Sequence, residues 1–199
     1  MSDFLALGDS YTIGEGVTRD ESWPLVLSSL LATRTSRLGT TEIIATTGWT
    51  TDELMAAIEA EQPSGPFELV TLLIGVNDQY RGRTPSEYRT GLVPLLERAV
   101  VLAGDDAGHV LAISIPDWGL TPFAEGRDRA AIAREIQEFN AVAAEAAARA
   151  GCRWADIRAA QDADRGTLLV ADALHPSARA YEAWASALLP FARAALGRA

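Results

Sequence analysis

The chain has 199 residues, enough for one domain with a full hydrophobic core, and we expect a single domain spanning residues 1–199. Its 17 basic and 27 acidic residues give a formal net charge of −10, and every basic residue is an arginine. Without lysine, Schiff-base catalysis and a P-loop are excluded, and the acidity disfavours nucleic-acid partners. The single cysteine, Cys152, excludes an internal disulfide and leaves few soft ligands for a metal site.

The opening residues lack the positive charge and the long apolar run of a signal peptide, and no segment is apolar enough to cross a bilayer. We therefore expect a cytoplasmic protein with no membrane insertion.

Short apolar runs alternate with helical patterns along the chain. The predicted strands are Phe4–Leu7, Glu42–Thr46, Phe67–Ile74, Val110–Ile115 and Cys152–Ile157. The predicted helices cover about 23–32, 50–58, 85–102 (bent at Pro94), 127–150 and a last segment that begins at Pro176. This alternation predicts an α/β fold with a parallel sheet of about five strands and helices on both faces.

Polar residues follow three of the predicted strands where ligands usually bind, at the carboxyl ends of a parallel sheet. A fourth polar group precedes the last helix. The four groups are Gly8-Asp9-Ser10, Thr47-Gly48-Trp49, Gly75-Val76-Asn77-Asp78 and Asp172-Ala173-Leu174-His175.

These residue types fit nucleophilic catalysis. Ser10 needs a base to take its proton, His175 can be that base, and Asp172 can orient the imidazole. The backbone N–H groups of Ser10 and Gly48 and the side-chain amide of Asn77 can converge on a developing oxyanion. We expect glycine at position 48 to let the backbone approach the substrate closely.

The four groups, in this order, resemble the sequence blocks of the GDSL, or SGNH, hydrolases. The resemblance spans residues 8 to 175. It implies a three-layer α/β/α sandwich of flavodoxin-like build. It also implies a nucleophilic Ser10, an oxyanion hole completed by Gly48 and Asn77, and a triad completed by Asp172 and His175. The family comprises esterases, lipases, thioesterases and carbohydrate deacetylases that need no metal, so we expect no cofactor and a small-molecule ester as the partner. Because the chain is short and has no large insertion, we expect an open cleft and a short acyl group. Tyr11 stands where the family often has leucine, so the shape of the pocket wall is expected to differ from the family's.

Other residues near the four groups receive supporting roles. We expect Asp9 and Asp78 to hold their loops, and Tyr11, Trp49 and Trp118 to line a substrate pocket. Arg81 and Arg83 are interpreted as solvated loop residues in preference to contacts with an anionic substrate. Outside the site, His109 is expected to be structural or on the surface, Cys152 to pack as a small apolar residue, and three tryptophans to lie in the core: Trp23, Trp154 and Trp184.

Three alternatives stay open at this point. The same site can serve an acyltransferase or a thioesterase, because sequence does not reveal the acyl acceptor. A non-catalytic flavodoxin-like module can bind phosphate or flavin at the glycine- and hydroxyl-rich segment 8–16, although that leaves Asn77, Asp172 and His175 unexplained. An α/β-hydrolase requires a G-x-S-x-G motif, which the chain lacks.

Overall fold

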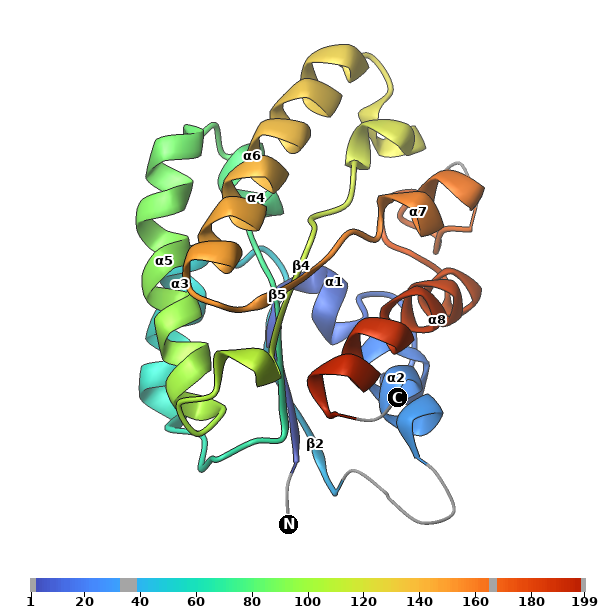
Figure 1. Ribbon diagram of the computed structural model, residues 1–199. Helices are drawn as coiled ribbons and strands as arrows, with labels where there is room; N and C mark the ends of the chain where they lie inside the picture. The colour runs from blue at the N-terminus through green and yellow to red at the C-terminus, as the bar shows by residue number, and fades with distance from the viewer. Residues whose placement is uncertain (1–2, 33–38, 165–167, 198–199) are drawn as a thin grey trace.

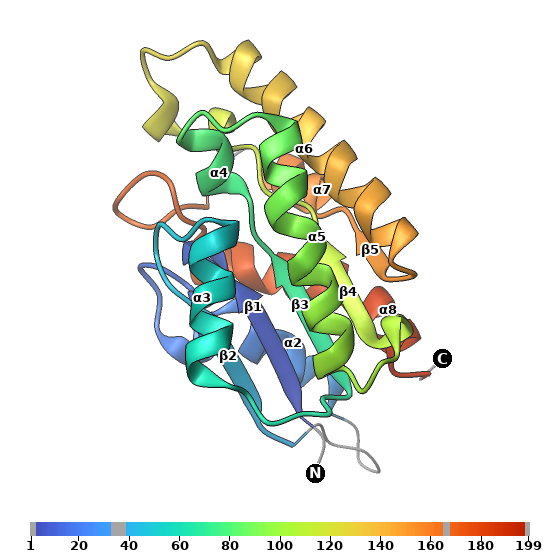
Figure 2. The same ribbon diagram turned by 90° about the vertical axis from the view of Figure 1, so that its left-hand side faces the viewer.

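A five-stranded parallel sheet forms the centre of the molecule, as the sequence predicts (Figures 1 and 2). A computed structural model describes residues 3–32, 39–164 and 168–197. The strands are β1 (Phe4–Gly8), β2 (Thr41–Ala45), β3 (Leu69–Leu73), β4 (Val110–Ile113) and β5 (Arg153–Ala155). Their order across the sheet, β2-β1-β3-β4-β5, is that of the flavodoxin-like folds.

Helices cover both faces of this sheet, which gives the expected three layers (Figure 1). The longer helices are α2 (Trp23–Leu31), α3 (Thr51–Glu61), α5 (Pro85–Leu102), α6 (Arg129–Arg149) and α8 (Ala178–Ala195). Helices α3, α5 and α6 lie on one side of the sheet, and α2 and α8 lie on the other. Because both faces are covered, every residue of β1, β3 and β4 is buried.

Three short helices were not predicted: α1 (Ser10–Ile13), α4 (Val76–Tyr80) and α7 (Arg158–Asp164). Two other boundaries also differ from the expectation. The last helix begins at Ala178 with Ser177 as its N-cap, because Pro176 forms an isolated antiparallel bridge with Leu169. Helix α6 begins at Arg129, where the side chain of Asp128 accepts a hydrogen bond from the Ala131 N–H.

Three of the predicted site loops begin side by side, because β1, β2 and β3 end at paired residues. Gly8, the last residue of β1, pairs with Ala45 of β2 on one side and with Leu73 of β3 on the other. A Cβ atom at Gly8 would lie 2.1 Å from Thr12 Oγ1 and 2.5 Å from the Leu73 carbonyl oxygen, so only glycine allows the chain to turn tightly into α1. This edge of the sheet therefore brings together residues that are far apart in sequence.

Candidate active site

Ser10 is the first residue of α1, immediately beyond the end of β1. The preceding residue, Asp9, is the N-cap of this helix, and its carboxylate accepts a hydrogen bond from the Tyr11 N–H at 3.0 Å. As the first helical residue, Ser10 has a backbone N–H with no acceptor inside the helix. The residue is buried, with 4% exposure, and lines a pocket.

His175 and Asp172 lie in contact on the loop before α8. The Asp172 Oδ2 atom is 2.5 Å from His175 Nδ1, and Asp172 Oδ1 accepts hydrogen bonds from the N–H groups of Leu174 and His175, each at 2.9 Å. Partial burial opposes ionisation of Asp172. The hydrogen bonds from His175 and from the backbone outweigh it and hold the pKa of Asp172 below its ordinary value. An ionised Asp172 can fix both the orientation and the tautomer of His175.

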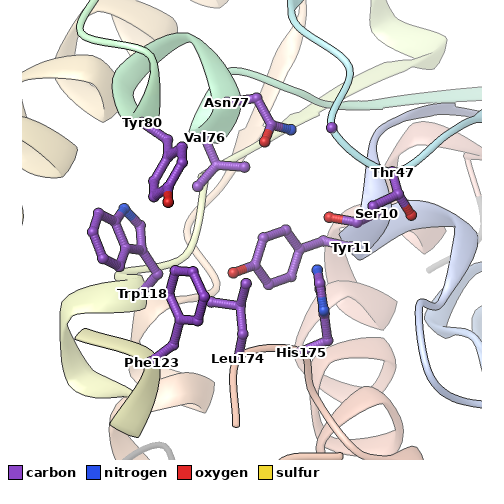
Figure 3. Close-up of a pocket in the computed structure, with 11 residues that line it drawn as sticks. Ser10, Tyr11, Thr47, Val76, Asn77, Tyr80, Trp118, Phe123, Leu174 and His175 are labelled. Atoms are coloured by element: carbon purple, nitrogen blue, oxygen red, sulfur yellow. The ribbon is translucent and has the colours of Figure 1, made fainter. Parts of the chain in front are cut away.

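The same loop is pinned by the backbone on both sides of His175. The His175 carbonyl accepts a hydrogen bond from the Val170 N–H at 2.9 Å, and Ser177 N–H donates to the Leu168 carbonyl at 2.8 Å. Ala173, between Asp172 and Leu174, has a φ of +61°, a conformation that non-glycine residues rarely adopt. The hydrogen bonds around it hold the turn that places His175 at the same end of the pocket as Ser10 (Figure 3).

Gly48 and Asn77 come from the loops that follow β2 and β3. Gly48 has a φ of +88°, and a Cβ atom there would meet nothing nearer than Arg81 Nη2 at 3.9 Å. The backbone conformation by itself favours glycine at 48, and the close approach of this backbone to a substrate stays a prediction. Asn77 Nδ2 donates to the Trp49 carbonyl at 2.9 Å and lies 3.4 Å from Asp9 Oδ2, a long contact. Both residues line the pocket with Ser10.

Arg81 and Arg83 are held by ion pairs. Arg81 Nη2 donates to the Gly48 carbonyl at 2.6 Å and lies 3.2 Å from Glu53 Oε2. Arg83 Nη1 lies 2.9 Å from Asp78 Oδ1 and 2.7 Å from the carboxylate of Asp52. The two arginines thus brace the loops after β2 and β3.

Asp78 is fully buried beneath these loops. Its two carboxylate oxygens accept hydrogen bonds from the Thr51 N–H at 3.1 Å and the Thr51 hydroxyl at 2.8 Å. Burial raises the pKa of Asp78, while the bonds from Thr51 and the charge of Arg83 act in the opposite direction. Its contacts join α4 to the start of α3.

The pocket over Ser10 has a volume of about 160 Å³ and mostly apolar walls. Trp118 lines it as expected, and its indole N–H donates to Gln79 Oε1 at 2.8 Å; Gln79 in turn donates to Glu135 Oε2 at 2.7 Å. Tyr11 also lines it, with its ring centroid 5.2 Å from that of His175. The sequence analysis assigned no pocket-lining role to five further residues that line it: Thr47, Val76, Tyr80, Phe123 and Leu174.

The expectation that Trp49 lines the substrate pocket was wrong. This residue does not line the pocket; its side chain is half-buried against the hydrophobic core, and only its carbonyl contacts a site residue, Asn77. Its position after Gly48 in the sequence suggested the pocket, but the positive φ at Gly48 changes the chain direction there. His109 lies at the opposite edge of the sheet, before β4, and Cys152 is a buried free thiol.

The described residues offer no obvious place for a metal ion. No group of three or more histidine, cysteine, aspartate or glutamate side chains in that part of the chain is arranged to hold one. Within residues 3–32, 39–164 and 168–197, no helix is both long and apolar enough to span a bilayer.

Comparison with known proteins identifies the family. A family model described as the GDSL-like lipase/acylhydrolase family matches residues 6–183. The chain belongs to this family. It is therefore an enzyme of the ester-cleaving serine hydrolase class.

Solved structures agree in fold. AlinE4, described as an SGNH-hydrolase family esterase, is 26% identical and has a TM-score of 0.66, over 94% of this chain and 93% of that one. TesA is 22% identical with a TM-score of 0.73, over 96% and 97% of the two chains. A variant of Axe2, an acetyl-xylooligosaccharide esterase from Geobacillus, is 21% identical with a TM-score of 0.72, over 96% and 94%. A search of curated proteins found no significant match.

The buried carboxyl of Asp9 is expected to make the free energy of unfolding depend on pH. It is fully buried, and burial together with the nearby charge of Asp78 raises its pKa to about 8, against the opposing hydrogen bond from the Tyr11 N–H. Between about pH 4 and pH 8 the folded protein therefore keeps a proton on Asp9 that the unfolded chain releases. Stability falls as pH rises through this window, by at most about 1.4 kcal/mol per pH unit.

We predict that Asp9→Asn removes this part of the pH dependence, because an amide cannot ionise. Urea denaturation of the wild type and the variant at about pH 5 and about pH 8 measures the change in the free energy of unfolding. The exposed Asp20, substituted as Asp20→Asn, provides the matched control and should follow the wild type. Equal pH dependence in the wild type and Asp9→Asn would show that Asp9 is ionised in the folded protein throughout.

Proposed function

We propose that this enzyme is a serine esterase that cleaves small carboxylic esters through an acyl-enzyme intermediate. The observation that supports this most strongly is the meeting, in one pocket, of Ser10, a His175 paired with Asp172 at 2.5 Å, and the loops that carry Gly48 and Asn77. The proposed reaction gives each of these five residues a role.

In the proposed first half-reaction, Ser10 Oγ attacks the carbonyl carbon of the ester while His175 takes the hydroxyl proton. The carbonyl oxygen becomes an oxyanion that accepts hydrogen bonds from the backbone N–H groups of Ser10 and Gly48 and from Asn77 Nδ2. The tetrahedral intermediate then collapses, the bond to the leaving oxygen breaks, and His175 donates its proton to the departing alcohol.

In the second half-reaction, water takes the place of the alcohol. His175 accepts a proton from the water as its oxygen attacks the acyl carbon, and the same donors hold the second oxyanion. When the bond to Ser10 Oγ breaks, His175 returns a proton to that oxygen and the carboxylic acid leaves. Asp172 stabilises the imidazolium formed in each half-reaction.

Asp9 and Arg81 are proposed to position the oxyanion donors. The hydrogen bond from Asn77 Nδ2 to Asp9 Oδ2 orients the amide but is long, at 3.4 Å, so an oxyanion can compete for this second amide hydrogen. The hydrogen bond of Arg81 to the Gly48 carbonyl limits movement of that loop. Donors fixed before the substrate arrives need little reorganisation during the reaction.

The pocket size favours short acyl chains. Its volume of about 160 Å³ is close to that of a cavity that holds one benzene molecule. Axe2, which is an acetyl-xylooligosaccharide esterase of similar fold, acts on a small acyl group. We therefore propose acetyl to butyryl esters as the preferred size.

We predict that the wild type hydrolyses p-nitrophenyl acetate and butyrate faster than the octanoate and palmitate, and that Ser10→Ala lowers kcat by at least about 10³-fold. Release of p-nitrophenol measures the rates. Ser86→Ala, at an exposed serine on α5, is the matched control and should match the wild type. Equal turnover by Ser10→Ala and the wild type would remove Ser10 as the nucleophile, and faster cleavage of palmitate would contradict the proposed pocket size.

A second prediction concerns the oxyanion hole. Asn77→Ala should lower kcat on p-nitrophenyl butyrate by about 10² to 10³-fold with little change in KM, because the lost hydrogen bond strengthens as the oxyanion forms. Urea denaturation is the control, since a loss of activity caused by a disordered Trp49 loop would be accompanied by lower stability. An unchanged kcat would exclude Asn77 from the oxyanion hole.

A further inference from the structure

The end of the pocket away from Ser10 carries an arginine stacked among three aromatic rings. The guanidinium carbon of Arg127 lies 5.1 Å from the ring centroid of Tyr80, 5.3 Å from that of Trp118 and 5.7 Å from that of Phe123. Its Nη2 atom also donates to the Tyr80 hydroxyl at 3.1 Å. All three rings line the pocket, and the exposed Arg127 lies against them just outside the lining residues.

This guanidinium is not neutralised by a carboxylate. Within the described residues, Arg127 has no ion pair, whereas Arg81 and Arg83 are each paired with acidic side chains. The acidic residues nearest in sequence, Glu125 and Asp128, are exposed, and Asp128 is engaged as the cap of α6. A guanidinium has five N–H donors and only one of these is used by Tyr80, so the others can bind an anion.

Among the residues that the structure describes, Arg127 differs from Arg81 and Arg83, the arginines beside the same site, in having aromatic rings and no carboxylate as its partners. With 27 acidic residues against 17 arginines, carboxylate partners are abundant. The stacking on three rings holds the planar group in place without a carboxylate, and a fixed guanidinium loses less conformational freedom when it binds one. A guanidinium that is held in place and has free N–H donors is suited to binding a carboxylate.

The direction of the acyl chain connects this cation to the substrate. Figure 3 shows Ser10 and His175 at one end of the pocket and Tyr80, Trp118 and Phe123 at the other. The leaving alcohol has to lie within reach of His175 to receive a proton, so the acyl chain extends away from His175, toward the rings. Between the two ends, Val76 and Leu174 provide apolar walls that suit a few methylene groups.

We propose that Arg127 is a specificity-determining residue that binds a carboxylate at the far end of the acyl chain, so that the preferred substrates are half-esters of short dicarboxylic acids. This rests on the proposed esterase function, because the direction of the acyl chain follows from Ser10 and His175. The apolar walls hold the methylene segment, and the free N–H groups of Arg127 hold the terminal carboxylate.

The test compares charged and neutral acyl groups of the same shape. The substrates are the monomethyl esters of succinic, glutaric and adipic acid, which vary the distance between ester and carboxylate, and the matched compounds in which a primary amide replaces the carboxylate. Liberated methanol measures the rate. The proteins are the wild type, Arg127→Gln, Arg127→Lys and, as a control for net charge, Arg193→Gln at the far end of α8 from His175.

We expect the wild type to prefer at least one half-ester over its amide by about tenfold or more in kcat/KM, the size of one charge-assisted hydrogen bond. Arg127→Gln should abolish this preference, chiefly through KM, and should change the rates with the amides by less than about threefold. Arg127→Lys keeps the charge without the planar fork and should retain only part of the preference. Arg193→Gln should behave as the wild type.

Three results would overturn the inference, and a fourth would contradict the proposed function on which it rests. No preference for any half-ester in the wild type, or the same preference in Arg127→Gln, would show that Arg127 only supports the aromatic wall. An equal loss in Arg193→Gln would assign the effect to net charge. Absence of Ser10-dependent hydrolysis of p-nitrophenyl butyrate would instead contradict the proposed esterase function itself.

Discussion

The parallel register of β1 with its two neighbours is the constraint on which the site depends. Gly8 pairs with Ala45 on one side and Leu73 on the other, so the three strands end side by side. Ser10, Gly48 and Asn77 follow these ends by only a few residues, and their loops meet without any long excursion of the chain. The loop of His175 is closed on itself by the backbone bonds of Val170 and Ser177, and it lines the same pocket.

Two buried carboxyl groups occupy the base of this arrangement. Asp9 and Asp78 are both fully buried, and burial raises the pKa of each. Removing such groups from water is costly unless they are hydrogen-bonded, and each here accepts bonds that join two segments of the site: Asp9 from Tyr11 and Asn77, and Asp78 from Thr51 and Arg83. These contacts limit movement of the proposed oxyanion donors, and the buried Asp9 carboxyl makes the stability of the protein depend on pH.

Much of the fold and of the site could be predicted from the sequence, because both depend on strong local signals. The five strands are apolar runs that end at glycine, proline or polar residues, and the polar residues that follow them lie together at one sheet edge. The short helices α1, α4 and α7 were missed because segments of four to seven residues are too short to show a helical period. Ser10 and Asn77 were correctly placed after their strands, although both lie inside such helices.

The pocket wall was less predictable. Tyr80 is the last residue of α4, and Phe123 lies in a short 3-10 turn at 122–124, so their meeting with Trp118 depends on how α6 and the loop after β4 pack. Trp49 was placed wrongly for a related reason, since neighbouring positions in sequence do not fix where a side chain points after a residue with positive φ. The ion pairs of Arg81 and Arg83 likewise join segments that are close only in the folded protein.

The central claim is that Ser10 is a nucleophile activated within this pocket, and active-site labelling tests it most directly. The wild type and Ser10→Ala are treated with a serine-reactive fluorophosphonate, followed by intact mass measurement and peptide mapping. The account predicts one adduct per wild-type chain, located on Ser10, and none on Ser10→Ala. An unlabelled wild type, or an adduct on another serine in both proteins, would contradict it.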